Sequence, residues 1–117
     1  MNNHEKINYL EFPSKDLEVT KKFFSQCFAW EFIDYGPEYI AITGAGIDGG
    51  FYLSELNSTI ELGSVLVVLY SKDLKVSEEK IIRHGGVISK ETFSFPGGQR
   101  FHFKDPNGNE YAVWCEV

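Results

Sequence analysis

The 117-residue chain has few cysteines, no long apolar segment and no cluster of basic residues. Cys27 and Cys115 form neither a metal-type Cys-x-x-Cys motif nor a disulfide framework, which favours free thiols in a reducing cytoplasm. The N-terminus lacks the basic start and apolar run of a signal peptide, and no apolar stretch reaches membrane-spanning length. The sequence therefore predicts a cytoplasmic protein that does not enter a membrane.

The balance of charge is acidic, with 17 Asp and Glu against 11 Lys and Arg and a formal net charge of −6. Proteins that bind nucleic acid neutralise phosphates with clustered cations, so this balance argues against a nucleic-acid partner. Aromatic residues, in contrast, are abundant at 15%, with ten Phe and six Tyr. These side chains have to line either a core or a cavity.

A six-residue segment occurs twice with little change. Ser14–Val19 reads Ser-Lys-Asp-Leu-Glu-Val, and Ser71–Val76 reads Ser-Lys-Asp-Leu-Lys-Val. The second copy starts 57 residues after the first, close to half the length of the chain. A repeat at this spacing indicates one structural unit that is built twice.

The first half predicts a strand, a helix and three further strands. Residues Ile7 to Phe12 are rich in strand-forming types, and Pro13 should end that strand. Asp16 is a suitable N-cap for the following helix, because its side chain can accept hydrogen bonds from backbone amides. Three short strands are expected at Trp30–Asp34, Tyr39–Thr43 and Phe51–Leu53.

The second half repeats this order. Ser64–Tyr70 is an apolar run expected to form a strand buried on both faces, and Asp73 repeats the N-cap of the helix. The segment Phe93–Gly98 is either a mobile lid with apolar side chains or a plain hairpin connection. The closing strands are expected at Val87–Lys90, Arg100–Lys104 and Glu110–Cys115.

Each half is therefore a β-α-β-β-β unit, and the fold class is α+β. We expect a single domain over residues 1–117, with module one at about 5–55 and module two at about 63–117. The two sheets are predicted to form a half-open, barrel-like sheet around a pocket. Sheets of this kind leave strand edges exposed, which favours a homodimer.

This pattern resembles the vicinal oxygen chelate superfamily, which includes glyoxalase I, extradiol dioxygenases and the bleomycin and fosfomycin resistance proteins. The resemblance rests on Ile7–Pro13 running into Asp16-Leu17, on Gly85-Gly86 after the second helix, and on Asp105-Pro106-Asn107-Gly108-Asn109-Glu110. It covers nearly the whole chain. It implies the paired-module fold, without specifying a reaction.

Enzymes of this superfamily typically hold a divalent metal with one side chain from each of four inner strands. The resemblance places those positions at Tyr9, Leu66, Ala112 and, within a residue or two, Leu53. Leucine and alanine have no donor atoms, and a lone phenol rarely binds a hard divalent ion. The three histidines share no metal-type spacing. We therefore expect no metal ligands and no cofactor.

Glu11 is the one candidate catalytic residue. It lies two residues after Tyr9 on the same strand, so both side chains should face the pocket. A carboxylate in an apolar aromatic pocket can serve as a general base or pair with a cationic ligand. The alternative is a structural role, in which Glu11 bonds nearby backbone or an arginine such as Arg100.

Six aromatic residues are candidate ligand contacts, either stacking on a hydrophobic or cationic ligand or simply filling the interior. Packing is favoured for the phenylalanines, whereas the polar groups of Trp114 and Tyr9 suit contact with a ligand. The six are Tyr9, Phe51, Tyr70, Phe101, Phe103 and Trp114.

Three functions remain open from the sequence. The leading hypothesis is a metal-independent protein of the glyoxalase and bleomycin-resistance type, which holds a small molecule in an aromatic-lined pocket. The first alternative is a metal-free isomerase- or lyase-like enzyme in which Glu11 acts as acid or base. The second alternative, a metal-dependent lyase or dioxygenase, is disfavoured because the ligand positions lack donors.

Overall fold

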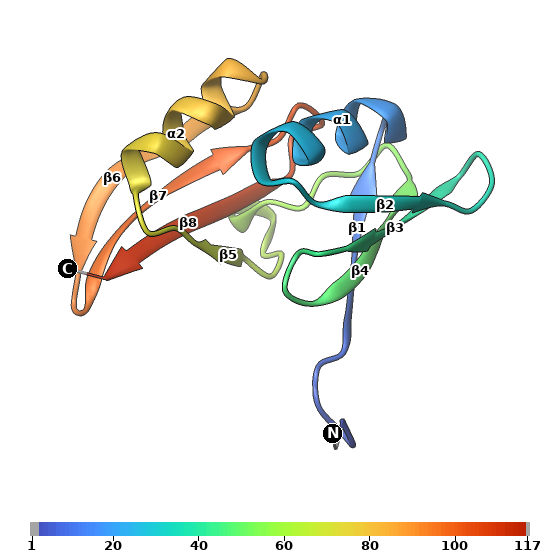
Figure 1. The fold of residues 1–117 in the computed structure, drawn as a ribbon, viewed down its shortest axis with the longest axis horizontal. Helices are drawn as coiled ribbons and strands as arrows, with labels where there is room; N and C mark the ends of the chain where they lie inside the picture. The colour runs from blue at the N-terminus through green and yellow to red at the C-terminus, as the bar shows by residue number, and fades with distance from the viewer. Residues whose placement is uncertain (1–2, 117) are drawn as a thin grey trace. The chain divides into compact units, whose positions relative to one another are not determined.

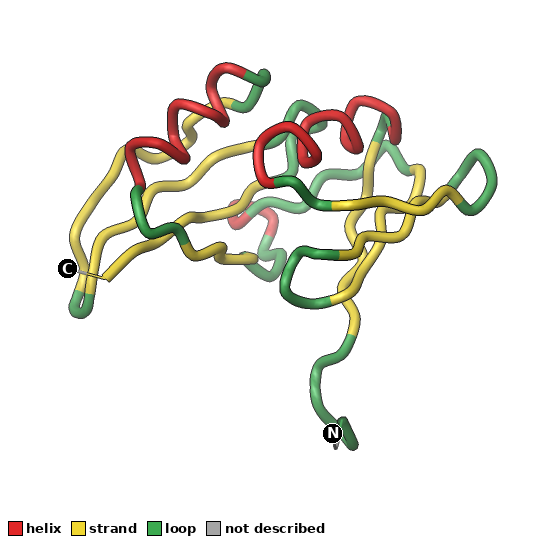
Figure 2. The backbone as a smooth tube through the Cα atoms, in the orientation of Figure 1, coloured by secondary structure: helices red, strands yellow, loops and turns green. Residues whose placement is uncertain are grey.

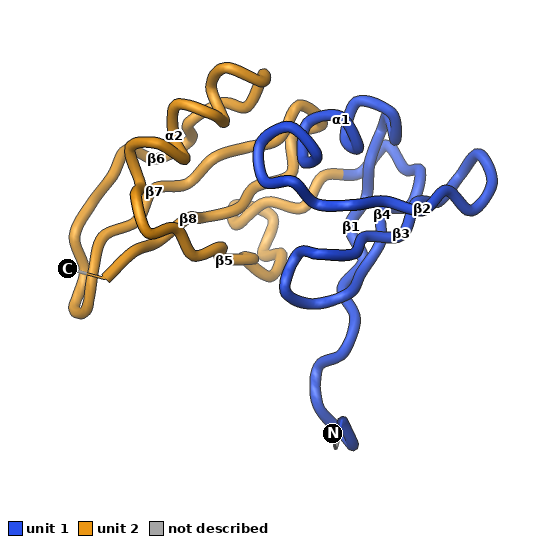
Figure 3. Tube along the Cα trace, in the orientation of Figure 1, with its two compact units in different colours: residues 1–56 blue, residues 57–117 orange. Residues whose placement is uncertain are grey.

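The structure is a computed structural model that describes residues 3–116. The chain divides into two compact units that meet between Leu56 and Asn57, which we call module one and module two (Figures 1 and 3). Each module contains one long helix and one four-stranded sheet. Figure 2 shows how helices, strands and loops follow one another along the backbone. The predicted α+β class and the repeated β-α-β-β-β order are confirmed.

Module one forms a mixed sheet with the strand order β1-β4-β3-β2. The pairing of β1 with β4 is parallel, and the other two pairings are antiparallel. The elements are β1 (Tyr9–Ser14), α1 (Leu17–Phe28), β2 (Glu31–Asp34), β3 (Tyr39–Thr43) and β4 (Asp48–Leu53).

Module two repeats this topology with the strand order β5-β8-β7-β6, in which β5 and β8 are parallel. A short 3-10 helix, η1, precedes the first strand. The elements are η1 (Ile60–Leu62), β5 (Val67–Tyr70), α2 (Leu74–Arg83), β6 (Val87–Phe95), β7 (Gly98–Lys104) and β8 (Glu110–Glu116).

Both helices begin at the aspartates of the repeated segment. Asp16 Oδ1 accepts from the amides of Glu18 and Val19, at 3.1 and 3.2 Å, and Asp73 Oδ1 accepts from the amide of Val76 at 3.3 Å. These bonds satisfy amide groups that the first turn of a helix leaves unpaired. The predicted N-caps are confirmed, and they explain why this segment is preserved in both halves.

The core of module one lies between its sheet and α1. Phe24 of α1 is fully buried and stacks on Trp30, with ring centroids 4.6 Å apart. Phe51 of β4 lies 5.6 Å from Phe24 and 5.1 Å from Phe12 of β1. Because strand side chains alternate, Tyr9 and Glu11 lie on the opposite side, which we call the open face of the module.

The core of module two uses the same side of its sheet. Ser71, which follows β5, binds Ser77 of α2, so alternation places Leu69 on the helix side together with its partner Val113. Tyr111 lies on this side as well and stacks on Phe103 at 5.1 Å, and both are fully buried. The open face of module two therefore carries the alternate residues of β5, β7 and β8.

Three sequence expectations need correction. Pro13 lies within β1 instead of ending it. β1 is at the edge of its sheet, and an edge strand tolerates proline because the backbone amides on its outer side pair with no other strand. Ser64–Tyr70 is not buried on both faces: β5 starts at Val67 and its residues alternate between half-buried and exposed. The strand expected at Val87–Lys90 extends to Phe95, so Phe93 and Phe95 lie in β6, and of the two interpretations of Phe93–Gly98 the structure matches the hairpin, with Pro96 and Gly97 between the strands.

Within residues 3–116, neither helix has the length and apolar character needed to cross a membrane.

Candidate functional site

On the open face of module one, Glu11 is hydrogen-bonded to a side chain that the sequence did not suggest. Tyr39 Oη donates to Glu11 Oε2 at 2.9 Å, and Tyr9 Oη lies 2.7 Å from Tyr39 Oη. Two predicted residues, Tyr9 and Glu11, are thus brought together, with Tyr39 between them. Within the described part of module one, the partner of Glu11 is this phenol and not the backbone that the sequence argument considered.

Gly50 makes this cluster possible. Tyr39 is on β3 and Glu11 is on β1, with β4 running between the two strands. Gly50 of β4 is the register partner of both Glu11 and Ala41, and a Cβ atom at this position would overlap the Tyr39 ring. The missing side chain therefore lets the phenol of Tyr39 cross β4 and reach Glu11.

The Tyr39 hydroxyl stays protonated in this arrangement. Burial raises its pKa above the ordinary value for tyrosine, and the hydrogen bonds to Tyr9 and Glu11 raise it further. Tyr39 can therefore act as a hydrogen-bond donor to the Glu11 carboxylate. Glu11 itself is exposed and Tyr9 is 45% exposed, so the cluster lies at an accessible surface of the module.

On the open face of module two lie four aromatic side chains, three of which are joined by ring contacts. Tyr70 and Trp114 are register partners whose rings meet edge to face at 5.4 Å, and Phe95 lies 6.2 Å from Trp114. Phe93 extends the group along β6. We call these four residues the aromatic platform. Tyr70 is 53% exposed and the other three are half-buried.

Irregular pairing of β6 with β7 puts two members of the platform, Phe93 and Phe95, on the open face. Lys90 pairs with His102, but the next partners are Phe93 and Arg100, so β6 uses one residue more than β7 over this interval. An extra residue reverses which face the following side chains occupy. Phe93 and Phe95 therefore share the open face with Arg100 and His102. Simple alternation from Lys90 would have placed them on the helix side.

Arg100 lies against this platform. Its guanidinium carbon is 5.3 Å from the centre of the Phe93 ring and 5.8 Å from that of Phe95. Lys90 Nζ is also near the Phe93 ring, at 4.7 Å. Such contacts between a cation and an aromatic ring hold the cation in place without using its hydrogen-bond donors. The Arg100 Nε atom is buried and has no hydrogen-bond partner among the described residues.

His102 is the second polar residue of this face. Its side chain is 2% exposed, and Nδ1 lies 3.2 Å from Glu110 Oε2. Glu110 also accepts from the Ile60 amide at 3.3 Å and from Ser89 Oγ at 3.4 Å. The histidine is therefore oriented by a carboxylate that is itself held by two further groups. Sequence reasoning passed over both His102 and Glu110.

A signal for this pair was present in the sequence. The turn Asp105–Gly108 fixes the register of β7 against β8, which pairs His102 with Ala112 and Lys104 with Glu110. His102 and Glu110 are then diagonal neighbours on one face, within reach of long side chains.

The phenylalanines among the predicted contact residues all lie in the cores. Phe51, Phe101 and Phe103 are fully buried on the helix side of their sheets. This location matches the packing alternative. Of the six aromatic candidates, the structure places only Tyr9, Tyr70 and Trp114 on open faces.

The turn before β8 contains a buried carboxyl group. Asp105 Oδ1 accepts from the amides of Asn107 and Asn109, at 2.9 and 3.0 Å, and Oδ2 accepts from Tyr111 Oη at 2.7 Å. Burial raises the pKa of Asp105 to about 6, although these hydrogen bonds act in the opposite direction. The group closes a turn, and its contacts are structural.

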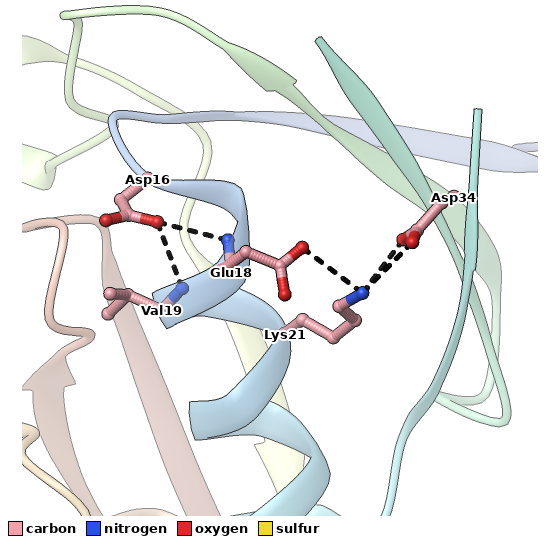
Figure 4. A network of polar contacts seen from close by, with 5 residues as sticks. All are labelled: Asp16, Glu18, Val19, Lys21 and Asp34. Atoms are coloured by element: carbon pink, nitrogen blue, oxygen red, sulfur yellow. Dashed lines mark hydrogen bonds and ion pairs between the residues drawn. The ribbon is translucent and has the colours of Figure 1, made fainter. Parts of the chain in front are cut away.

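A surface depression of about 390 Å³ lies beside the start of α1. Two carboxylates of its lining pair with the neighbouring Lys21, whose Nζ lies 2.9 Å from Asp34 and 3.3 Å from Glu18, while Asp16 caps the helix (Figure 4). The hydrogen bond to Asp34 is the main reason that the pKa of Lys21 is raised. The depression is on the helix side of the sheet and contains none of the predicted site residues.

The positions that the family resemblance assigns to a metal do not fit one. Tyr9 lies on the open face of module one, whereas the register of β1 with β4 puts Leu53 on the helix side. Leu66 and Ala112 lack donor atoms. Within the described residues, no group of three or more His, Cys, Asp and Glu side chains is placed to hold a metal ion. The residues present thus offer no metal centre through which a reaction step can be drawn.

The two modules, each a helix packed on a four-stranded mixed sheet, define the class of fold. Residues 6–113 match the family model for the Glyoxalase/Bleomycin resistance protein/Dioxygenase superfamily, so the chain belongs to this superfamily. None of the curated proteins matches it.

Solved structures with low sequence identity share the fold. A glyoxalase-related enzyme from Fulvimarina pelagi has a TM-score of 0.78 and 16% identity, covering 96% of this chain and 88% of that one. A glyoxalase/bleomycin resistance protein/dioxygenase family enzyme from Burkholderia phytofirmans PsJN has a TM-score of 0.76 and 15% identity, covering 94% and 98%. The fosfomycin resistance protein FosX from Mesorhizobium loti has a TM-score of 0.76 and 12% identity, covering 97% and 93%.

Proposed function

We propose that this chain is a metal-independent small-molecule-binding protein whose ligand lies on the aromatic platform of module two. The observation that carries the proposal is the accessible Tyr70 ring packed against Trp114, with Phe95 beside it. Aromatic rings with a polar group at one end offer a flat apolar body a large contact area and keep a hydrogen-bonding group available.

The donor set supports binding without a metal. A divalent ion needs several oxygen, nitrogen or sulfur ligands that converge on one point. The positions where the family resemblance would put such ligands hold two leucines and an alanine beside Tyr9. A metal-dependent lyase or dioxygenase is therefore disfavoured.

The alternative is a metal-free isomerase- or lyase-like enzyme that uses Glu11. The cluster of Glu11, Tyr39 and Tyr9 favours this alternative, because a phenol and a carboxylate joined by a hydrogen bond can share a proton with a substrate. Against it, Glu11 is exposed and lacks the apolar surroundings on which the sequence argument for a general base depends.

A ligand screen by thermal shift tests the proposed function, because a ligand that binds only the folded protein raises its apparent stability. Hits are repeated on Trp114→Ala and Glu11→Gln. We expect Trp114→Ala to abolish the shift produced by most hits and Glu11→Gln to leave it unchanged. If neither substitution weakens any hit, the platform is not the binding site. If only Glu11→Gln does so, the site lies on module one.

The homodimer expected from the sequence is also a proposal. Within module two, strand β6 runs for nine residues at the edge of its sheet and carries charged and polar side chains. Sedimentation equilibrium on the full chain distinguishes a monomer from a homodimer by mass. A species of twice the 13.3 kDa chain mass supports the dimer.

A further inference from the structure

The starting observation is a pair of buried nitrogen atoms without partners. Among the residues that the structure describes, only Arg100 Nε and His102 Nε2 are buried side-chain polar atoms that lack a hydrogen bond. Nearly all such atoms in folded proteins are paired, so each exception needs a reason. These two lie two residues apart on β7, which puts them on the same face of one strand.

Two aromatic rings hold the guanidinium of Arg100 in position. Phe93 and Phe95 flank its guanidinium at 5.3 and 5.8 Å, and the Phe93 ring also lies 6.0 Å from the His102 ring. A guanidinium has donors and no acceptors, and its planar arrangement of N–H groups matches a carboxylate or phosphate. The partner that suits Arg100 Nε is therefore an oxyanion.

His102 presents its second nitrogen beside that position. An ionised carboxylate can only accept, so the hydrogen-bond network assigns a proton to Nδ1 for its contact with Glu110. The ring is thereby fixed, and Nε2 is left for a partner outside the chain. It can donate or accept, depending on the charge of the ring.

The anions of this face are already engaged. Glu110 accepts from Ile60, Ser89 and His102, and Glu116 accepts from Tyr70. The face also carries the cations Lys90 and Lys104 by register. None of the ion pairs among the described residues includes Arg100, although the protein as a whole is acidic.

We propose that Arg100 and His102 form an oxyanion subsite next to the aromatic platform, so that the ligand is a small carboxylic acid with a flat apolar body. The body lies on Tyr70 and Trp114, and the carboxylate accepts a hydrogen bond from Arg100 Nε and, when the His102 ring carries both protons, a second one from His102 Nε2. This inference rests on the proposed function and names the chemical class of the ligand.

The test compares benzoate with benzamide, which has nearly the same shape and no charge. Binding to the full chain is measured by calorimetry or by NMR titration. We expect benzoate to bind about tenfold more tightly than benzamide, because a charge-assisted hydrogen bond is stronger than a neutral one. Equal binding of the two compounds would overturn the subsite and leave the platform, and with it the proposed function, intact.

Two variants separate the subsite from general charge. Arg100→Met should weaken benzoate binding about tenfold and leave benzamide unchanged. Lys104→Met removes one positive charge from the same strand face, without removing an unpaired buried atom, and should change benzoate binding less than about twofold. Equal losses in the two variants would contradict a specific role for Arg100.

NMR of the unaltered protein tests the subsite without any substitution, so the result does not depend on whether a variant folds. In the unaltered ¹⁵N-labelled protein, benzoate should shift the Arg100 Nε–H and His102 ring resonances, and benzamide should not. If benzoate leaves both resonances unchanged, the two nitrogens are satisfied by water and the inference is wrong. The proposed function then fails separately only if the thermal-shift screen also gives no hit that depends on Trp114.

Discussion

In both modules, two hydroxyl groups at equivalent positions form a hydrogen bond between the helix and the end of the first strand. Ser14 Oγ lies 2.8 Å from Thr20 Oγ1 in module one, and Ser77 Oγ lies 2.7 Å from Ser71 Oγ in module two. The aspartate N-caps and the parallel pairing of the first strand with the last are repeated as well. What is preserved in both copies is what the helix-covered side of the fold requires.

The open faces differ. Module one carries a phenol–carboxylate cluster of Tyr9, Tyr39 and Glu11, whereas module two carries the aromatic platform with Arg100 and His102. Because the fold does not require either set, their difference is the part of the molecule most free to specialise. The following predictions test whether helix-side residues determine stability and open-face residues determine binding.

The largest loss of folding stability should come from substituting the buried phenylalanines that the sequence also offered as ligand contacts. Phe51→Ala in module one and Phe103→Ala in module two should each lower the free energy of unfolding by about 3–5 kcal/mol, because each leaves a cavity in a core. Tyr70→Ala, on the open face, should cost less than about 1 kcal/mol. Chemical denaturation measures all three. A cost for Phe51→Ala no greater than that for Tyr70→Ala would contradict the assignment of faces.

The buried carboxyl group of Asp105 should make the stability of module two depend on pH. The pKa of Asp105 is about 6 in the folded protein against an ordinary value of 3.8, so between these pH values the folded state keeps a proton that the unfolded state has lost. The contribution of Asp105 is therefore greatest below about pH 4 and falls as pH rises to about 6, by on the order of 3 kcal/mol.

The comparison protein for this effect is Asp105→Asn. The stability of the unaltered protein relative to this variant should decrease between pH 4 and pH 6, and a carboxyl NMR titration should place the midpoint near 6. Parallel stability curves for the two proteins over this range would show that Asp105 is not the buried acid we describe.

Gly50 should tolerate a methyl group only when Tyr39 is shortened. Gly50→Ala alone should cost about 1–3 kcal/mol, because its Cβ overlaps the Tyr39 ring. In a Tyr39→Ala background the same change should be nearly neutral, and this difference is the coupling in a double-mutant cycle. Additive costs would mean that Tyr39 does not cross β4 over this glycine.

The smallest effects should come from the repeated hydroxyl pairs. Thr20→Val leaves the buried Ser14 hydroxyl without this partner and should cost about 1–2 kcal/mol, while Ser77→Ala, at a site that is 8% exposed, should cost about 0.5–1 kcal/mol. Both values come from denaturation at one pH. A larger cost for Ser77→Ala than for Thr20→Val would show that the two hydroxyl pairs do not stabilise their modules in the same way.

Local signals predicted the fold well. The N-caps at Asp16 and Asp73 depend on neighbours within three residues, and the β-α-β-β-β order follows from turn residues and apolar spacing. The strand limits were less accurate. Pro13 was taken as an end because proline lacks an amide donor, but the position of β1 at the edge of its sheet removes that objection.

The site was only partly predictable, because its contacts depend on register between strands. Tyr39 meets Glu11 only because Gly50 lies between them, and Phe93 faces Arg100 only because β6 contains an extra residue. Neither fact follows from alternation along a single strand. Trp114 was proposed as a ligand contact from its residue type, because an aromatic ring with a polar group suits a surface that is partly apolar and partly wet, but its pairing with Tyr70 depends on register.

The two tryptophans provide the most direct test of the central claim, because each module has one. Trp30 is buried in the core of module one, and Trp114 is on the platform of module two. A screen hit is titrated, with a chelator present, into Trp30→Phe and Trp114→Phe proteins while tryptophan fluorescence is recorded. We predict a saturable change in the protein that retains Trp114 and none in the protein that retains Trp30. A change confined to Trp30, or a change that the chelator abolishes, would contradict metal-independent binding on module two.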